Sequence, residues 1–249
     1  MGVRVKLKQL FPLLLLLISP SLMAEEFSTT NLQLLYGSNF HDRYYGNNTS
    51  DGNMTTLTLE HFGTWAYGDN FFFVDLTSGK FVDFGGAPTG SNSHIYAEWA
   101  PRISLSRLTD KNVSAGIFKD LFIAGELNRD GLGFHAELIG LGTDLDIPGF
   151  NVASINAYLR KDNFNKATYQ VTGIWSVPLG SLLSFEGYID INGTDNDGIE
   201  INTQPQLLLD IGQLLAESSG KVKIGIEWYV HRNRWMNSSV PQAMTKWVW

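Results

Sequence analysis

Apolar and polar residues alternate with a period of two along most of the chain beyond residue 30. The clearest case is the segment 182–192, where nearly every second residue is apolar. One face carries Leu183, Phe185, Ile189 and Ile191, and the other carries Ser184, Glu186, Tyr188 and Asp190. Because successive side chains of a β-strand point to opposite faces, this pattern predicts strands with one apolar and one polar face.

Segments with this alternation predict about twelve strands of roughly ten residues each. They cover residues 30–39, 55–64, 71–77, 93–105, 119–128, 133–143, 151–161, 167–177, 182–192, 200–210, 221–232 and the last segment up to Trp249. Taken alternately, the polar or Gly-rich connections form extracellular loops at 40–54, 78–92, 129–132, 162–166, 193–199 and 233–240, and periplasmic turns at 65–70, 106–118, 144–150, 178–181 and 211–220. Pro101 lies on the apolar face of the fourth segment and predicts a β-bulge there.

The last segment keeps its alternation up to the final residue. Ala243, Thr245, Trp247 and Trp249 form one face, and Gln242, Met244, Lys246 and Val248 form the other. Outer-membrane barrels have aromatic girdles at the membrane interfaces and no open edge. We therefore expect an all-β fold, a transmembrane antiparallel up-and-down β-barrel of about 12 strands, which closes on the strand ending at Trp249. Gln242 and Lys246 are then expected to face the lumen.

The first 24 residues have the composition of a signal peptide. Three basic residues precede a short apolar run over 10–18, and Leu22-Met23-Ala24 is an acceptable cleavage site. The run is shorter than the roughly 18–20 residues that a membrane-spanning helix needs. The sequence predicts a signal peptide over 1–24 and an outer-membrane β-barrel over 25–249, in the cell outer membrane of a Gram-negative bacterium. A soluble β-sandwich would show the same alternation, but export and strand length favour the barrel.

Composition and charge narrow the classes of function. Removal of residues 1–24 takes away three of the 18 Lys and Arg residues and none of the 25 Asp and Glu residues, so the remainder has a formal net charge of −10. Such a chain lacks the basic surface that nucleic-acid binding needs. The absence of cysteine excludes a disulfide scaffold and thiol catalysis.

The polar faces of the predicted strands would line the interior of the barrel. They combine aromatic rings with ionisable groups, whereas a nonspecific pore needs mainly charge. Rings beside carboxylates suit a flat, polar, uncharged solute that carries a sugar, because stacking contributes roughly 1–3 kcal/mol per base. The candidate binding residues are Glu60, Phe71, Phe73, Asp75, His94, Tyr96, Glu98, Arg102, Glu186, Tyr188 and Asp190. The alternative is that these charges pair with one another and that the rings fill a narrow barrel.

Glu60-His61-Phe62, followed by the run from Tyr67 to Asp75, resembles the second hairpin of the Tsx-like family of nucleoside-specific outer-membrane channels. Pro101-Arg102-Ile103-Ser104 and the stretch 140–146 are similar to further blocks of this family. Other blocks are closest to its OmpK branch, which consists of vibrio outer-membrane proteins that serve as phage receptors; they are the stretch 204–210, Gly225-Ile226-Glu227-Trp228 and Pro241-Gln242-Ala243-Met244. The resemblance covers nearly the whole chain after the signal peptide.

This resemblance implies a monomeric barrel of twelve strands that passes nucleosides and deoxynucleosides passively and uses no cofactor or metal. The match to the family is best around Asp75 and Arg102. The partners it implies are nucleosides, outer-membrane lipid and lipopolysaccharide, the barrel-assembly machinery acting through the strand that ends at Trp249, and a bacteriophage. The alternative within the same fold is a general small-solute porin or a surface receptor barrel without nucleoside selectivity.

An outer-membrane enzyme is the competing class of function. Such an enzyme needs a Ser–His or Asp–His pair at the barrel rim. The chain has only five His residues, and His61 falls on the lipid-facing side. It has no Gly-x-Ser-x-Gly motif. The acidic run 190–198 hints at calcium but has Asp195 where an EF-hand loop requires glycine. A surface loop is the favoured interpretation of this run, and a channel is favoured over an enzyme.

Overall fold

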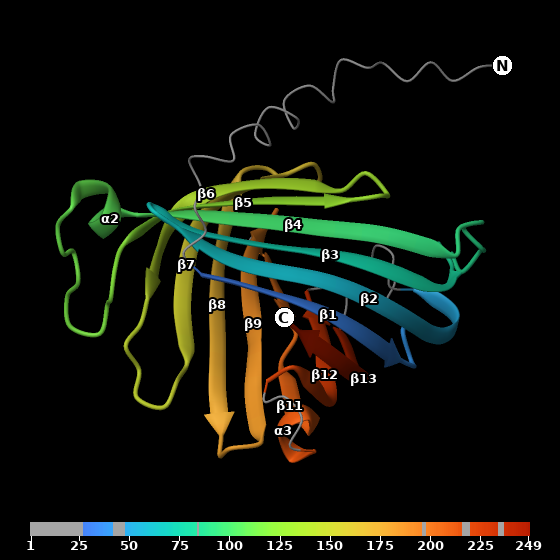
Figure 1. Ribbon diagram of the computed structural model, residues 1–249. Helices are drawn as coiled ribbons and strands as arrows, with labels where there is room; N and C mark the ends of the chain where they lie inside the picture. Colours follow the sequence, from blue (N-terminus) through green and yellow to red (C-terminus); the bar gives the residue numbers. More distant parts are fainter. Residues whose placement is uncertain (1–26, 42–47, 84, 196–197, 216–219, 234–236) are drawn as a thin grey trace, which may run out of the picture.

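The computed structural model describes residues 27–41, 48–83, 85–195, 198–215, 220–233 and 237–249 (Figure 1). Its strands are β1 (Phe27–Gly37), β2 (Thr49–Trp65), β3 (Gly68–Phe81), β4 (Ser93–Ser104), β5 (Phe122–Asp130), β6 (His135–Asp144), β7 (Val152–Asp162), β8 (Thr168–Leu179), β9 (Leu183–Thr194), β10 (Gly198–Thr203), β11 (Gln206–Asp210), β12 (Val222–Arg232) and β13 (Asn237–Val248). Two short helices, α2 (Leu105–Thr109) and α3 (Ile211–Leu214), follow β4 and β11. Within these ranges, no helix is long and apolar enough to cross a membrane. The predicted signal peptide over 1–24 lies outside the described residues.

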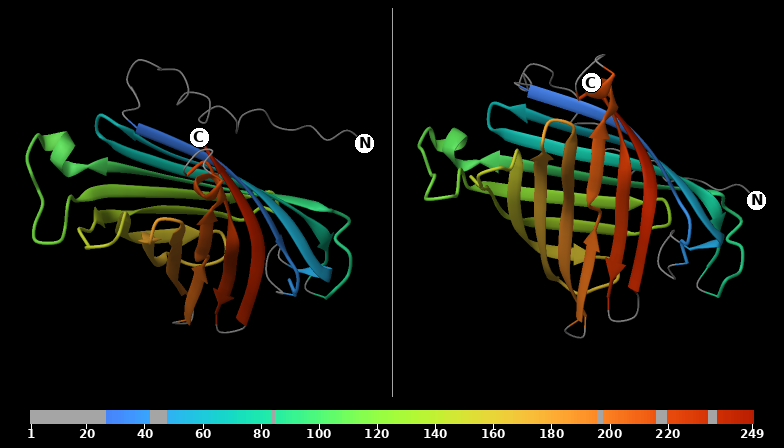
Figure 2. Two further views of the ribbon diagram at one scale, coloured as in Figure 1. Left: turned by 60° about the horizontal axis from the view of Figure 1, so that its bottom comes forward. Right: turned by 90° about the horizontal axis from the view of Figure 1, so that it is seen from below.

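The strands form one closed antiparallel sheet. Each strand from β1 to β9 pairs with its neighbours along the chain, and β13 pairs with both β12 and β1. β10 and β11 each pair with β9 on one side and β12 on the other, so together they form a single crossing of the wall. The described residues therefore form a barrel with twelve crossings, which confirms the predicted fold class (Figures 1 and 2).

The pairing is staggered around the barrel. Stepping across paired residues from Gln33 leads to Thr58, Asp75 and Tyr96, and then to Asp130 at the far end of β5. Strands must tilt to close a barrel with such a stagger, and both views in Figure 2 show the tilt. We call the end that holds the β1–β2, β3–β4 and β5–β6 connections the loop end, and the opposite end the turn end.

The tenth crossing is interrupted at Gln204 and Pro205. Proline has no N–H group to donate to a neighbouring strand, and the Pro205 carbonyl instead accepts a bond from the amide of Trp228 at 2.8 Å. Gly187 of β9 lies opposite the break with a φ of 153°. A Cβ at this position would lie 2.7 Å from the Gln204 carbonyl oxygen, so glycine is required where β9 meets the interruption. The predicted strand over 200–210 is confirmed apart from this break.

The two faces of the strands have the predicted parity. On β7, Leu159 points outward and is 72% exposed, whereas its neighbours Tyr158 and Arg160 are 4% and 8% exposed. Outward apolar side chains of this kind form the band that a membrane barrel presents to lipid. Gln242 and Lys246 of β13 face the lumen, as predicted.

The predicted β-bulge at Pro101 is wrong. The pairs Trp99–Leu127 and Arg102–Ala124 share one register across β4 and β5, and the register between β4 and β3 is continuous through Pro101. Pro101 lies on the outward face, and the pairings of Ala100 and Pro101 with β5 are missing from the ladder without any residue being added to the strand.

The strands are longer at the loop end than predicted. β2 begins at Thr49 rather than at residue 55, and β13 begins at Asn237 rather than after residue 240. A register shift between Thr49 and Met54 explains the first difference, since it falls on turn-forming residues that hide the alternation.

Candidate functional site: the barrel lumen

A cavity of about 1060 Å³ occupies the interior of the barrel. Side chains from every crossing line it, from Asp120 and Asn151 at the turn end to Leu132 and Phe134 at the loop end. All the residues predicted from the sequence line this cavity: Glu60, Phe71, Phe73, Asp75, His94, Tyr96, Glu98, Arg102, Glu186, Tyr188 and Asp190. The structure divides them into groups with different surroundings.

Five of these residues form one compact patch on β3 and β4. The register pairs Phe73 with Glu98 and Asp75 with Tyr96, so two rings lie on one diagonal and two carboxylates on the other. The Phe73 and Tyr96 rings are 5.9 Å apart, and Phe71 continues the row with its ring 6.1 Å from that of Phe73. Diagonal neighbours on paired strands are within reach of aromatic side chains. We call Phe71, Phe73, Asp75, Tyr96 and Glu98 the ring–carboxylate patch.

Neutral donors orient the carboxylates of this patch. The Thr58 hydroxyl donates to Asp75 at 2.5 Å. The Tyr96 hydroxyl donates to Glu98, and the Asn128 amide donates to the same oxygen at 3.0 Å. These partners hold the two carboxyl groups in place, and the remaining lone pairs of their oxygens can accept hydrogen bonds from a solute.

A second acidic group, centred on Gln170, lies on β5, β8 and β9. The Gln170 amide donates to Asp190 at 3.2 Å and to Glu126 at 3.4 Å, and Thr172 donates to Asp190 at 2.5 Å. Arg160 donates to the Gln170 side-chain oxygen at 2.6 Å. The alternation of apolar and polar residues puts Glu126 and Arg160 at inward positions of β5 and β7. Nothing in the sequence singles out Gln170, because a neutral amide at an inward position carries no distinguishing signal.

Arg102 lies at the turn end with its guanidinium engaged on every nitrogen. Two nitrogens donate to Asp69 at 2.9 and 2.7 Å, and the third donates to Asp144 and Ser154, both at 2.9 Å. The Phe122 ring lies 4.1 Å from the guanidinium carbon. Two-point arginine–carboxylate pairs are strong and directional. Arg102 therefore acts as a structural brace, linking β4 to β3, β6 and β7. For this residue the alternative interpretation holds, in which charges in the lumen pair with one another.

Glu60 and Glu186 belong to a third group, which is centred on Lys246. The Lys246 ammonium lies 3.3 Å from Glu186 and 3.9 Å from Glu60. Lys223 lies 3.9 Å from Glu186, and Asn31 donates to Glu60 at 2.7 Å. The inward direction of Lys246 follows from the alternation. Its partners do not, because they come from β2 and β9.

Tyr188 and His94 lie apart from these groups. The Tyr188 hydroxyl accepts a bond from Asn202 at 3.3 Å. His94 lies near the loop end, where its ring contacts Phe81 with the centroids 3.9 Å apart, and its Nε2 atom is buried and has no hydrogen-bond partner among the described residues. His94 is therefore not part of the ring–carboxylate patch, although it is two residues from Tyr96 along β4.

The connection after β4 lies beside the turn-end mouth of the cavity. It contains helix α2, and Ser104 caps this helix by accepting a bond from the Arg107 amide at 3.0 Å. The Ser104 hydroxyl also donates to Asp120, as does the Ser106 amide at 3.2 Å. Burial acts to raise the pKa of Asp120, but these hydrogen bonds outweigh it, and the pKa lies below its ordinary value. Asp120 is thus an anion at this mouth at neutral pH.

Acidic side chains outnumber basic ones along the cavity. Twelve Asp or Glu residues line it, against six Lys or Arg residues. A cleft lined by one sign of charge focuses the electrostatic field and concentrates ions of opposite sign. In the part of the chain that the structure describes, no group of His, Asp or Glu side chains could hold a metal ion.

In a planar bilayer under a KCl gradient, the barrel is expected to be cation-selective, because the excess of carboxylates repels chloride. Asp120→Asn should shift the reversal potential toward zero, since it removes one negative charge at the turn-end mouth. Glu137→Gln on the outward face is the matched control and should leave the potential unchanged. An anion-selective wild-type channel would contradict the assignment of the lumen charge.

The profile of the family described as "Nucleoside-specific channel-forming protein, Tsx" matches residues 36–247. The chain belongs to this family. It is also similar to two proteins named outer membrane protein OmpK, from Vibrio parahaemolyticus and from its serotype O3:K6 strain RIMD 2210633. The identities are 28% over 146 residues and 29% over 151 residues.

These alignments cover 55% and 54% of this chain and 55% of each relative, so the chain spans about half the length of the curated relatives it matches. Among solved structures, the Tsx-family barrel is similar to a KdgM porin, with a TM-score of 0.51 and 8% identity over 88% of this chain and 98% of that chain. At this identity the similarity shows the fold alone. Family and fold together identify this chain as a β-barrel of the Tsx family, whose relatives are named outer-membrane proteins.

Proposed function

We propose that this channel passes nucleosides and deoxynucleosides by passive diffusion, without a cofactor and without catalysis. The observation that carries the proposal is the ring–carboxylate patch, where aromatic rings and oriented carboxylates alternate on the lumen wall. A nucleoside combines a flat base with a sugar that carries hydroxyl donors. The patch offers a partner to each part at neighbouring positions.

The base is expected to stack on the row of Phe71, Phe73 and Tyr96, and the sugar hydroxyls are expected to donate to Asp75 or Glu98. Stacking contributes roughly 1–3 kcal/mol per base, which is enough to favour nucleosides over sugars of similar size. Such sites must also stay weak for the solute to leave. The acidic lumen disfavours phosphorylated nucleosides, because their charge has the same sign as that of the wall.

The proposal also includes partners outside the lumen. The outward apolar residues are suited to outer-membrane lipid and lipopolysaccharide. Assembly through β13 by the barrel-assembly machinery and attachment of a phage at the loop end rest on the resemblance to the family alone. A monomer is favoured because the sheet closes within one chain.

Block of single-channel current tests nucleoside selectivity directly. Adenosine or thymidine is expected to reduce the current, and liposomes containing the channel should swell faster in a nucleoside than in a sugar of similar size. Phe73→Ala and Asp75→Ala should each weaken the block roughly tenfold, in line with the loss of one stacking ring or one oriented acceptor. Leu76 lies on the outward face of the same strand and is 50% exposed, so Leu76→Ala should leave the block unchanged.

A heat-modifiable gel shift should confirm that each variant is folded. The barrel is a general small-solute porin if two results are found together: adenosine and thymidine do not block the current, and liposomes swell no faster in a nucleoside than in the sugar. If nucleosides block the current through both lumen variants as strongly as the current through the wild-type channel, the ring–carboxylate patch is not the site.

A further inference from the structure

Phe40 follows β1, and its backbone is fastened to the start of β2. Asn39 before it has a φ of 80°, in the left-handed region that few residues other than glycine and asparagine adopt. The Phe40 amide donates to the Gly52 carbonyl at 2.8 Å, and the Phe40 carbonyl accepts bonds from the Thr49 amide and hydroxyl at 3.1 and 3.3 Å. The residue is 0% exposed. Its position is therefore specified by the backbone as well as by packing.

The Phe40 side chain packs inside the barrel. It forms an apolar cluster with Met54, Phe81, Tyr229 and Val240, which come from β2, β3, β12 and β13. The Phe40 and Tyr229 rings are 5.8 Å apart. Met54 and Tyr229 also line the cavity, so the cluster borders directly on the lumen. We call these five residues the loop-end cluster.

Gly37 provides the seat for this ring. It lies on the inward side of β1, where a Cβ would be 2.7 Å from Cε2 of Phe40 and 3.0 Å from Cγ of Gln242. Contacts this short require the neighbouring atoms to move. The ring of Phe40 therefore fits only because position 37 has no side chain.

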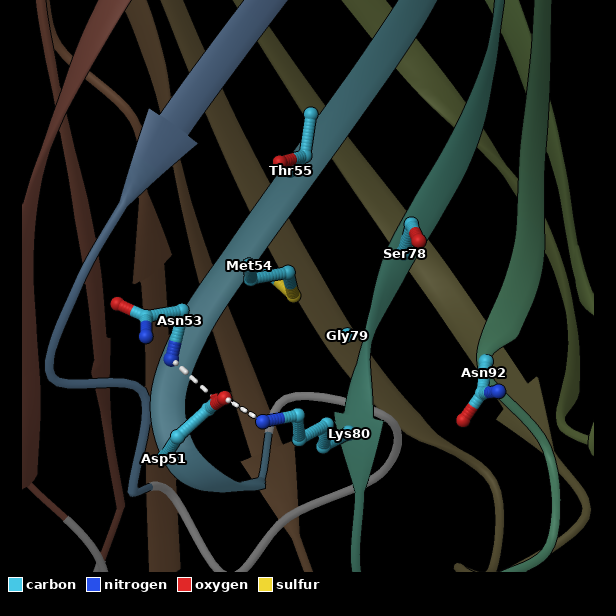
Figure 3. A pocket seen from close by; sticks show the side chains of 8 residues that line it. All are labelled: Asp51, Asn53, Met54, Thr55, Ser78, Gly79, Lys80 and Asn92. Carbon is cyan, nitrogen blue, oxygen red and sulfur yellow. Dashed lines mark hydrogen bonds and ion pairs between the residues drawn. The ribbon is translucent and has the colours of Figure 1, made fainter.

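The irregular start of β2 supports Phe40 from the other side. The register shift between Thr49 and Met54 brings Gly52, with a φ of 73°, under the Phe40 amide. Figure 3 shows how this stretch is held to β3: Asp51 accepts a bond from the Asn53 amide at 3.1 Å and pairs with Lys80 at 3.0 Å. The surface pair contributes little stability by itself, but it links the shifted stretch to the neighbouring strand.

The cavity extends unequally at the loop end. On the side of β5 and β6 it reaches Leu132 and Phe134 in the connection between those strands. On the opposite side its lining ends at Met54 on β2 and at Gln242 on β13, next to the loop-end cluster, and on β12 it continues from Tyr229 to His231. The cluster thus fills part of the barrel interior beside the cavity at this end.

We propose that Phe40 is a selectivity-determining constriction residue of this channel. Its ring, folded into the barrel over Gly37, narrows the loop-end mouth and limits the size of the solutes that enter. The consequence concerns pore dimensions and holds for any permeant, so it is independent of nucleoside preference.

Channel conductance of the full chain in KCl tests the proposal. Phe40→Ala should raise single-channel conductance by roughly 1.5- to 2-fold, because current follows the narrowest cross-section of the pore. It should also raise the size limit for uncharged polyethylene glycols that enter the pore. Gly37→Ala should instead lower both quantities, since the added methyl group on the inward side of β1 pushes the ring away from the wall and toward the lumen.

Leu34→Ala on the outward face of β1, where Leu34 is 44% exposed, is the matched control and should leave both quantities unchanged. A folded Phe40→Ala protein with unchanged conductance and size limit would overturn the proposal and leave Phe40 a packing residue. If Phe40→Ala does not fold, Gly37→Ala decides, and unchanged conductance in a folded Gly37→Ala barrel has the same meaning.

Discussion

Arg102→Met is expected to lower the free energy of unfolding by about 3–5 kcal/mol. Arg102 is the shared partner of Asp69 and Asp144, and its side chain is 11% exposed. Its removal leaves two carboxylates facing each other across the turn end without a counter-charge. The loss of the ring contact with Phe122 adds to the effect. Urea unfolding of the barrel in detergent micelles, followed by tryptophan fluorescence, measures this change.

Arg129→Met is the matched control. Arg129 also pairs with a carboxylate, Glu137, at 2.6 Å, but the two side chains are 51% and 47% exposed. Pairs of this kind contribute less than about 1 kcal/mol. Arg102→Lys should fall between the two, because lysine keeps the charge but cannot form the two-point contact. Equal losses for Arg102→Met and Arg129→Met would show that the Arg102 group is not a structural brace.

Removal of residues 247–249 is expected to abolish most folding into the closed barrel. Thr30 and Trp249 exchange two backbone bonds of 3.0 Å, and Trp247 lies between Leu32 of β1 and Val222 of β12. Without these residues, two strands lose their partner at the turn end and expose unpaired backbone groups to lipid. Unsatisfied backbone groups are costly there, because the bilayer core offers no water to replace the bonds.

Refolding of the purified shortened chain into detergent, scored by the heat-modifiable gel shift, measures the loss. Trp249→Ala keeps the backbone bonds and removes only a side chain that is 58% exposed, so it should refold almost normally. Because no assembly machinery is present in this experiment, the result reports on barrel closure alone. A shortened chain that refolds like the full-length one would show that the pairing between β13 and β1 is dispensable.

The direction of each side chain could be predicted from the sequence with few errors. Alternation along β9 places Glu186, Tyr188 and Asp190 in the lumen, and the structure confirms it. The errors lie where local residue preferences and strand pairing disagree. Pro101 suggests a bulge but is accommodated on the outward face, whereas the real register shift in β2 is hidden among turn-forming residues.

The partners of each lumen side chain could not be predicted in the same way. Lys246 meets Glu60 and Glu186 from β2 and β9, and Arg102 meets Asp144 from β6. Those distances depend on the stagger between strands, which no single strand encodes. Phe40 is a stronger case. It lies in a predicted loop, where no alternation of apolar and polar residues predicts which way a side chain points. Its place inside the barrel depends on the absence of a side chain at Gly37.

The sequence by itself determined a closed antiparallel barrel, the face of each strand and the acidic, ring-bearing character of the lumen, because strand geometry makes side-chain direction a property of position alone. Only the tertiary structure decided which charges neutralise one another, which carboxylates stay open to a solute beside the rings, and where the mouth is narrowed. These features arise from the stagger that closes the sheet, which brings together residues far apart in the chain.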